Sequence, residues 1–200
     1  MSLAYIALGA NLPSLAGPPE ATLAAAAERL ASLGRITARS SLYSTAPVGY
    51  QDQPRFVNAA VALDTQLSPR DLLDALLAME FEFGRDRAAS PANGPRTLDL
   101  DILFYGDLVL GASGLEIPHP RLAERAFVLV PLNEIAPDLC DPRSGRTVSE
   151  LLQALRSAPS TSPVHAIESV VQIESNFWRV AVDSAPSAGS SRPNADPDRG

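Results

Sequence analysis

The sequence contains no lysine, and all 16 of its basic residues are arginine. A P-loop nucleotide site requires a lysine that reaches the phosphates, and a protein kinase requires a lysine on a strand. An enzyme that works through a Schiff base requires a lysine amine. The sequence therefore excludes these classes in their usual form. Any phosphate that the chain binds must be held by arginine side chains, backbone amides or metal ions.

Cysteine and histidine are scarce as well. The single cysteine, Cys140, excludes a disulfide framework and a cysteine-rich zinc site. Two histidines far apart in the sequence, His119 and His165, leave little for a histidine-based metal cage. No apolar run approaches the ~18 residues of a membrane span. The N-terminus has no positively charged segment of the kind that opens a signal peptide.

The charge balance is acidic. Asp and Glu total 23, which gives a net charge of -7 and weighs against nucleic acid as the main partner, because phosphate backbones bind to basic surfaces. Hydrophobic residues make up 46% of the 200 residues, enough to form the core of one domain. We therefore expect a cytoplasmic globular protein that binds neither nucleic acid nor membrane.

The order of the expected elements is β-α-β-β-α-β. Strands are expected at residues 3–11, 35–45, 56–66 and 97–105, and helices at residues 18–33 and 68–84. The second helix has Ser68 at its N-cap and Pro69 at its first position. This order predicts an α/β (α+β) ferredoxin-like layered fold with an antiparallel sheet.

The C-terminal part of the chain changes character. Further helices are expected at residues 127–135 and 147–155, which end a globular domain assigned to residues 1–156. Residues 157–200 form a Ser/Pro-rich extension, of which residues 183–200 have the composition of a disordered tail. Within the extension, residues 164–182 are more apolar and favour a strand or a helix, to which the sequence assigns no role.

Asp99 and Asp101 carry the strongest chemical signal. They occupy positions i and i+2 of an expected strand, so both carboxylates point to one face, with Cα atoms about 6.6 Å apart. Leu98, Leu100 and Ile102 then point into the core. Neighbouring carboxylates repel one another unless a cation lies between them, and hard divalent cations prefer such oxygen ligands. The pair therefore indicates a metal site, with a solvated strand face as the alternative for such a pair seen alone.

Arginines cluster around this pair in the sequence. They are Arg85, Arg87, Arg96, Arg121 and Arg125. Guanidinium groups beside a metal–polyphosphate complex would hold the phosphate charge that the metal ions leave. Surface salt bridges are the alternative explanation. Glu80, on the helix that leads to Arg85, is either a third acid of the site or an exposed helix acid.

Other residues are candidates for binding a ligand. His119 is held between two prolines near Arg125, which favours a hydrogen bond to phosphate over a purely structural role. Phe56 and Phe127 are either core residues or rings on which a flat heterocycle stacks. Asn58 shares a strand face with Phe56, and a buried amide there needs a hydrogen-bonding partner. The loops at residues 46–54 and 86–95 are candidate lids or ordinary connections.

The segment GPRTLDLDIL at residues 94–103 closely resembles the signature of the 6-hydroxymethyl-7,8-dihydropterin pyrophosphokinase (HPPK) family. Three further segments resemble that family in the same order. AYIALGANL is similar to its first strand, STAPVGYQDQPRFVNAAVAL to its pterin-side loop and strand, and PHPRLAERAFVLVPLNEIAPDL to its C-terminal segment. The resemblance extends from about Ala4 to Leu155.

The resemblance implies an enzyme, a diphosphokinase that transfers the terminal pyrophosphoryl group of ATP to the hydroxymethyl group of a reduced pterin. The products are AMP and the pterin pyrophosphate that is used for folate synthesis. The resemblance also implies two Mg²⁺ ions per active site, a monomer, and the ferredoxin-like fold.

Each implied role falls on a position that matches the family's motifs. Asp99 and Asp101 match the two Mg²⁺-binding aspartates. Arg85 and Arg96 match the arginines that act on the phosphates during transfer. The nucleotide-side positions are Glu80, Arg87, His119 and Arg125. The pterin-side positions are Thr45, Ala46, Val48, Phe56, Asn58 and Phe127.

Three positions depart from the family pattern. Asn93 stands where some members have Trp, Gly114 where some have Arg, and Ala46 where Pro is common. These differences bear on loop closure and ATP affinity rather than on the chemistry. The extension after Leu155 has no counterpart in the pattern.

Two alternative functions stay open. Ferredoxin-like layers also serve as ligand sensors and RNA-binding modules. An RNA-binding module would need basic and aromatic residues on the open sheet face, where this chain has Asp99 and Asp101. A degenerate regulator would have no need to keep the aspartates and arginines together. A different diphosphokinase or Mg²⁺-dependent nucleotidyl enzyme is the other alternative, and AMP as the product would separate the two.

Overall fold

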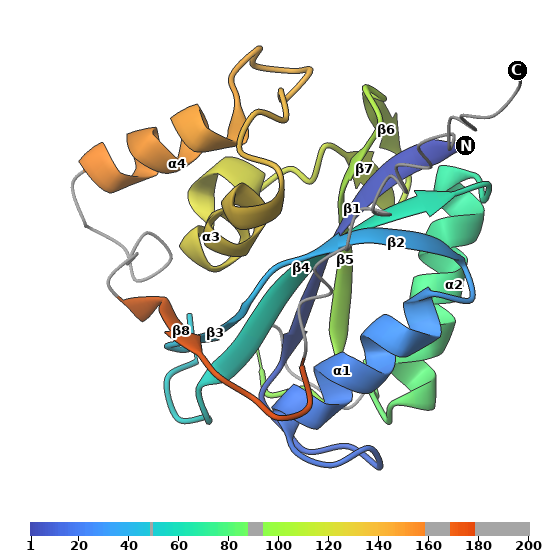
Figure 1. Cartoon of the computed structure of the whole chain (residues 1–200), viewed down its shortest axis with the longest axis vertical. Coiled ribbons are helices and arrows are strands. Elements are labelled where there is room, and N and C mark those ends of the chain that lie inside the picture. Colours follow the sequence, from blue (N-terminus) through green and yellow to red (C-terminus); the bar gives the residue numbers. More distant parts are fainter. Residues whose placement is uncertain (49, 88–93, 159–168, 179–200) are drawn as a thin grey trace, which may run out of the picture.

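The computed structural model of the chain describes residues 1–48, 50–87, 94–158 and 169–178. A six-stranded antiparallel sheet with helices on both faces forms its centre (Figure 1). The strands of this sheet are β1 (Ser2–Ala10), β2 (Gly34–Arg39), β3 (Leu42–Thr45), β4 (Phe56–Thr65), β5 (Asp99–Tyr105) and β8 (Val171–Ile173). The helices are α1 (Pro19–Leu30), α2 (Pro69–Glu82), α3 (Ala126–Ile135), α4 (Val148–Ser157) and the 3₁₀ turn η1 (Leu122–Glu124).

The strand order is β5-β1-β4-β3-β8, and β2 pairs with the second half of β4. With β2 and β3 counted as the one strand expected at residues 35–45, the chain up to β5 has the expected β-α-β-β-α-β order, and the ferredoxin-like fold is confirmed. β1 lies between β4 and β5, so that Gly9 is opposite Asn58 on one side and Asp99 on the other. The register thus brings these three residues together from distant parts of the sequence.

Helices α1 and α2 cover one face of the sheet. Leu23 and Leu30 of α1 and Leu72 of α2 pack against Ile6 and Leu8 of β1 in one buried cluster. The start of α2 is the expected one, because the Ser68 hydroxyl accepts a hydrogen bond from the Asp71 amide at 3.2 Å. Local capping and burial of the apolar stripe thus fix the helix in place.

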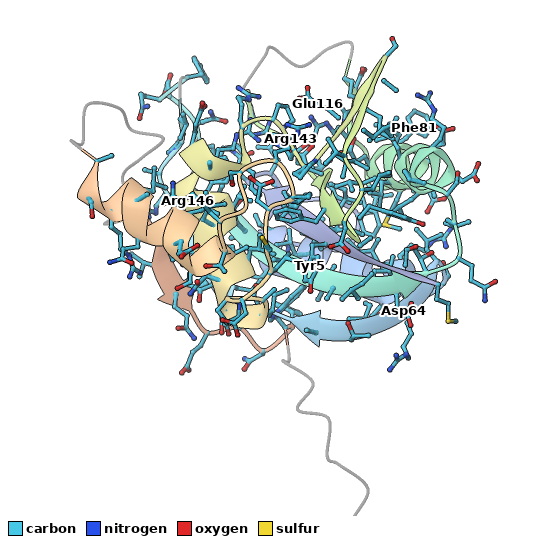
Figure 2. The ribbon with its side chains drawn as sticks, turned by 90° about the horizontal axis from the view of Figure 1, so that it is seen from above. Tyr5, Asp64, Phe81, Glu116, Arg143 and Arg146 are labelled. Carbon is cyan, nitrogen blue, oxygen red and sulfur yellow. The ribbon has the colours of Figure 1, made fainter. Side chains whose placement is uncertain are left out.

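Helices α3 and α4 cover part of the other face. Leu129 of α3 and Leu152 of α4 belong to a second buried cluster with Tyr5 and Phe104, the latter two in edge-to-face contact at 6.4 Å. Figure 2 shows Tyr5 on the strands beneath these helices. The ends of β1, β4 and β5 line a cavity together with the start of α3. The candidate site lies in this cavity.

The structure differs from the sequence expectations in its edge elements. The strand expected at residues 35–45 is two strands that both pair with β4, because the pairing is interrupted at Ser40, whose hydroxyl accepts the amide of Ala60 at 2.9 Å. The first helix ends at Leu30 instead of residue 33. The short hairpin of β6 (Leu110–Ala112) and β7 (Leu115–Ile117) was not expected.

The hairpin is tied to the loop before α4. The Arg143 side chain forms an ion pair with Glu116 at 3.1 Å and donates a hydrogen bond to the Ile117 carbonyl at 3.2 Å (Figure 2). α4 then begins with a capping box between Thr147 and Glu150. These contacts fix the segment that leads into His119.

The apolar stretch expected at residues 164–182 contains strand β8 in its described part. The tail expected at residues 183–200 lies outside the described residues. Among the helices of the described ranges, none combines the length and the apolar character needed to cross a membrane.

Candidate functional site

A cavity of about 420 Å³ opens at the ends of β1, β4 and β5. All of the residues that the sequence analysis assigned to a site line this cavity except Glu80 and Arg87. The sheet supplies one wall, and the His119 loop and the start of α3 supply another. Residues as far apart in the sequence as Ala7 and Val128 therefore meet around one space.

The floor of the cavity is made of small residues on β1. A Cβ atom at Gly9 would lie 3.1 Å from Asn58 Oδ1 and 3.9 Å from Asp99 Cβ. Gly9 therefore keeps open the space between the amide of Asn58 and the carboxylate of Asp99. The sequence analysis assigned this glycine no role in the site.

The acidic side of the cavity is formed by β5. Asp99 and Asp101 both line it, whereas Leu100 between them is 1% exposed on the opposite face, as the alternation predicted. Asp99 forms an ion pair with Arg85, and its second oxygen lies 3.3 Å from Arg96 Nε. Arg125 is 3.8 Å from Asp101 Oδ2. Arginine charge thus surrounds the two carboxylates.

The charged forms of the two carboxylates nevertheless repel one another. Burial, and next the charge of Asp99, raise the pKa of Asp101, while Arg125 and Arg96 lower it. A group whose charged form is penalised in this way is stabilised by any cation that approaches both oxygens. The electrostatics of the pair therefore favour binding of a cation.

The donor set fits Mg²⁺ bound together with a polyphosphate. In the residues that the structure describes, no group of three or more His, Cys, Asp or Glu side chains forms a metal cage. Mg²⁺ is typically held by one or two carboxylates, with water and substrate phosphates completing its octahedron. Asp99 and Asp101, side by side and open to the cavity, match that pattern.

Glu80 lies beneath the cavity rather than in its wall. It is 1% exposed, so the alternative of an exposed helix acid is wrong. Its carboxylate accepts the Leu100 amide at 2.8 Å and the Arg87 guanidinium at 2.6 Å, and it lies 3.6 Å from Arg85. Burial raises the pKa of Glu80, and the hydrogen bond from Leu100 and the charge of Arg85 oppose that rise. Glu80 thus orients both arginines.

His119 is held as a neutral imidazole. Burial, and next the charges of Arg125 and Arg121, lower the pKa of His119 to about 4. The Arg121 amide donates a hydrogen bond to Nδ1 at 3.2 Å, so the proton of the neutral ring is on Nε2. Arg125 Nη1 lies 3.5 Å from that nitrogen. A guanidinium can only donate, so Arg125 Nη1 and the Nε2–H of His119 are two donors side by side, and an acceptor such as a phosphate oxygen would receive both.

The depressed pKa of His119 gives a testable titration. We expect its imidazole protons to titrate near pH 4 in an NMR experiment, well below the ordinary value of 6.5. Between these two values the unfolded chain binds a proton that the folded chain does not, so the free energy of unfolding falls as the pH decreases from 6.5 to 4. Replacing Arg125 by alanine should raise the midpoint.

Assignment of that signal is simple because the chain has only two histidines. His119→Gln removes one resonance and identifies it. Arg35→Ala, at an exposed arginine paired with Asp64, serves as the matched control and should leave the midpoint unchanged. A midpoint near 6.5 in the unaltered protein would contradict the structural description of His119.

The opposite side of the cavity is aromatic and amide-bearing. The guanidinium of Arg96 stacks 4.9 Å above the ring of Phe56, and that of Arg125 lies 5.5 Å from the ring of Phe127. The amide of Asn58 donates to Thr45 Oγ1 at 2.8 Å, and both residues are buried. This side can therefore accept a flat ring with hydrogen-bonding edges, next to a side that suits phosphate and metal.

Sequence comparison identifies the family of the chain. The family model for 7,8-dihydro-6-hydroxymethylpterin-pyrophosphokinase (HPPK) matches residues 5–137. The 2-amino-4-hydroxy-6-hydroxymethyldihydropteridine pyrophosphokinase of Pseudomonas aeruginosa is 53% identical over 152 residues, which cover 75% of this chain and 90% of that protein. The protein of the same name from Synechocystis sp. is 46% identical over 152 residues, which cover 75% of this chain and 74% of that protein. The chain belongs to the HPPK family.

Solved structures agree on the HPPK fold. A crystal structure of a triple mutant of Plasmodium falciparum HPPK-DHPS has a TM-score of 0.65 at 16% identity, covering 86% of this chain and 46% of that chain. The wild-type protein has a TM-score of 0.60 at 16% identity, covering 78% and 45%. This chain thus spans less than half of those longer proteins, and at such identity the likeness concerns the fold.

A residue that supports the cavity walls was also missed by the sequence analysis. Asn11 is 3% exposed, and its side-chain amide donates to Gln53 Oε1 at 2.9 Å and to the Pro54 carbonyl at 3.1 Å. Its oxygen accepts the Arg96 amide at 2.7 Å. Asn11 therefore connects the loop before β4 to the segment that carries Arg96. No local signal reveals this role, because its partners lie 42 to 85 residues away.

The three positions that depart from the HPPK pattern lie in different parts of the chain. Gly114 forms the turn between β6 and β7 with a φ of 76°, a backbone conformation that an arginine would adopt only with strain. Ala46 lines the cavity beside Thr45. Asn93 lies outside the described residues.

Proposed function

We propose that the chain transfers the pyrophosphoryl group of ATP to the hydroxymethyl group of 6-hydroxymethyl-7,8-dihydropterin, giving AMP and the pterin diphosphate for folate biosynthesis. The observation that carries the proposal is the meeting of two sides in one cavity. An aspartate pair with arginines stands next to an aromatic and amide-bearing wall. Membership of the HPPK family supports the same reaction.

The pterin is proposed to bind between Phe56 and Phe127. Stacking on the two rings would bury its faces, and Asn58 would read its hydrogen-bonding edge. The bond from Asn58 to Thr45 fixes the direction of the amide, so its oxygen remains available as an acceptor. Ala46 and Val48 would complete the apolar border of the pterin site.

The nucleotide is proposed to bind on the side of His119 and Arg125. Asp99 and Asp101 would hold two Mg²⁺ ions together with the phosphates of ATP. When bound, these ions would neutralise phosphate charge and lower the pKa of the attacking hydroxyl. Arg85 and Arg96, already adjacent to Asp99, would stabilise the charge that develops at the transferred group. Glu80 would keep Arg85 and Arg87 oriented for this task.

The chain's own part in the reaction is mainly positional. The cavity brings the hydroxymethyl group to the β-phosphorus of ATP, which saves the entropy of a bimolecular encounter. The hydroxyl oxygen would form a bond to the β-phosphorus and release its proton to solvent, as the bond between the β-phosphorus and the oxygen bridging it to the α-phosphorus breaks. AMP would leave with that bridging oxygen. The neutral His119 would donate its Nε2–H to a phosphate oxygen and keep this hydrogen bond throughout the transfer.

Product analysis tests the proposal directly. The protein is mixed with ATP, Mg²⁺ and 6-hydroxymethyl-7,8-dihydropterin, and the nucleotides are separated. AMP that forms only when both pterin and Mg²⁺ are present would support the reaction. ADP as the product would indicate a different kinase. Pterin binding without AMP would indicate the degenerate regulator considered above.

Gly9, at the floor of the cavity, gives a second prediction for the same reaction. Replacing Gly9 by leucine is expected to raise the KM for the pterin by more than about tenfold, because the side chain would occupy the space between Asn58 and Asp99. The KM is measured from initial rates of AMP formation. Gly111→Leu is the matched control, since a Cβ atom there has no neighbour within 4 Å. An unchanged pterin KM in Gly9→Leu would show that the ligand does not reach this floor.

A further inference from the structure

Residues 169–178 lie along the outer edge of the sheet, although the chain reaches them only after α4. Strand β8 pairs with β3 so that Leu42 is opposite Ile173 and Ser44 is opposite Val171 (Figure 1). Gln172 adds a side-chain hydrogen bond to Ser41 Oγ at 3.0 Å. Without this segment, the four-residue strand β3 would form the open edge of the sheet.

Trp178 anchors the end of the segment. It is 7% exposed and packs in the buried cluster that includes Leu42. Its indole N–H donates to the Ser40 carbonyl at 2.7 Å, and the guanidinium of Arg39 lies 5.6 Å from its ring. The carbonyl of Ser40 at the break between β2 and β3 thus obtains its partner from a residue 138 positions away.

Arg55 connects the segment to the pterin-side loop. Its guanidinium donates to the Ser169 carbonyl at 2.9 Å and to the Ser44 carbonyl at 3.2 Å. Its Nε donates to Ser44 Oγ at 2.9 Å. Arg55 immediately precedes Phe56, and Ser44 immediately precedes Thr45. The segment therefore holds the backbone next to two residues that face the cavity.

We propose that residues 169–178 are a positioning segment for pterin binding, an inference that rests on the proposed function. A short strand that is paired on both sides opens less readily than one at an edge. Thr45 is the last residue of β3, and its hydroxyl fixes the amide of Asn58. Loss of the outer pairing would let Thr45 and Phe56 move, and small misplacements of positioning groups are costly. The segment lies beyond the family match, which ends at residue 137.

The test compares two shortened chains, one ending at Ala158 and one ending at Val182. The first lacks the positioning segment, whereas the second retains it and lacks only the residues after it. We expect the chain ending at Ala158 to bind 6-hydroxymethyl-7,8-dihydropterin about tenfold more weakly, equivalent to ~1.4 kcal/mol. Calorimetry with a non-hydrolysable ATP analogue present measures this dissociation constant without turnover. ATP affinity should change less than twofold, and the chain ending at Val182 should match the full chain.

Point variants keep the test valid if the shorter chain does not fold. Trp178→Ala removes the anchor, and Arg55→Met removes the link to Ser169 while keeping most of the side-chain volume. Both should weaken pterin binding and raise the pterin KM with little change in kcat. Phe177→Ala is the matched control, because Phe177 is 58% exposed on the same segment. Trp178 is the only tryptophan, so its fluorescence reports whether the segment is packed.

The outcomes separate the inference from the proposed function. A lower melting temperature with unchanged pterin affinity would overturn the positioning role and leave only a structural one. Equal weakening of ATP and pterin binding would overturn it as well. If the full chain binds pterin but forms no AMP, the proposed function fails, and the affinities of the variants still decide the inference. If the full chain does not bind pterin at all, both are overturned.

Discussion

Asp101→Asn is expected to reduce AMP formation to less than a tenth of the wild-type rate. The change keeps the shape of the side chain but removes the charge that a divalent cation requires. Asp99→Ala should have the same effect on turnover, with an added loss of stability because it leaves Arg85 without its closer partner. Rates are measured across a range of Mg²⁺ concentrations, and folding is checked by thermal unfolding.

The control for the aspartate variants is Asp107→Asn. Asp107 is exposed just after β5 and does not line the cavity. Its replacement should leave both the rate and the Mg²⁺ requirement unchanged. Retention of more than a tenth of the wild-type rate by Asp101→Asn or Asp99→Ala would rule out the proposed metal site.

Arg96→Ala is expected to lower kcat by ~10²–10³, the range for removal of one preorganised group that stabilises developing charge. In the described part of the chain, Arg96 Nε is buried and makes no hydrogen bond, although it lies 3.3 Å from Asp99 Oδ2 as an ion pair. The backbone of Arg96 is fixed by hydrogen bonds from the Asn11 and Leu12 amides, both at 3.0 Å. Its side chain is therefore held ready for a ligand.

Steady-state kinetics distinguishes this role from simple binding. A fall in kcat means that Arg96 acts in the transition state, whereas a change confined to KM would mean that it binds substrate and transition state equally. Arg70→Ala is the matched control, because Arg70 is 61% exposed on α2 and pairs only locally with Asp74. It should leave both parameters unchanged.

The aspartate pair of the site and the start of α2 could be predicted because their signals are local, whereas most other site positions were implied by the resemblance to the family. The period of two in a strand places Asp99 and Asp101 on one face with Leu100 on the other, and the structure has this arrangement. The N-cap at Ser68 is visible within four residues of sequence. A period or a cap depends only on neighbouring positions, so it is present in the sequence in full.

Residues whose roles depend on distant partners could not be predicted. Asn11, Arg55 and Trp178 make their decisive hydrogen bonds to groups 42 to 138 residues away. The break at Ser40 has the same origin, because a β-branched and aromatic run gives no sign that a hydroxyl will accept the Ala60 amide. Such contacts are set by the register of the sheet and by the packing of the C-terminal segment.

The central position of β1 determines the order in which ligand binding and amide protection are lost as the protein unfolds. The amides of β1 are enclosed between β4 and β5, so their exchange with deuterated solvent should require opening of the whole sheet. The cavity walls at Thr45 and His119 belong to a short strand near the edge of the sheet and to a loop. Mild denaturant should therefore abolish ligand binding while the deuterium protection of the floor at Gly9 is still intact.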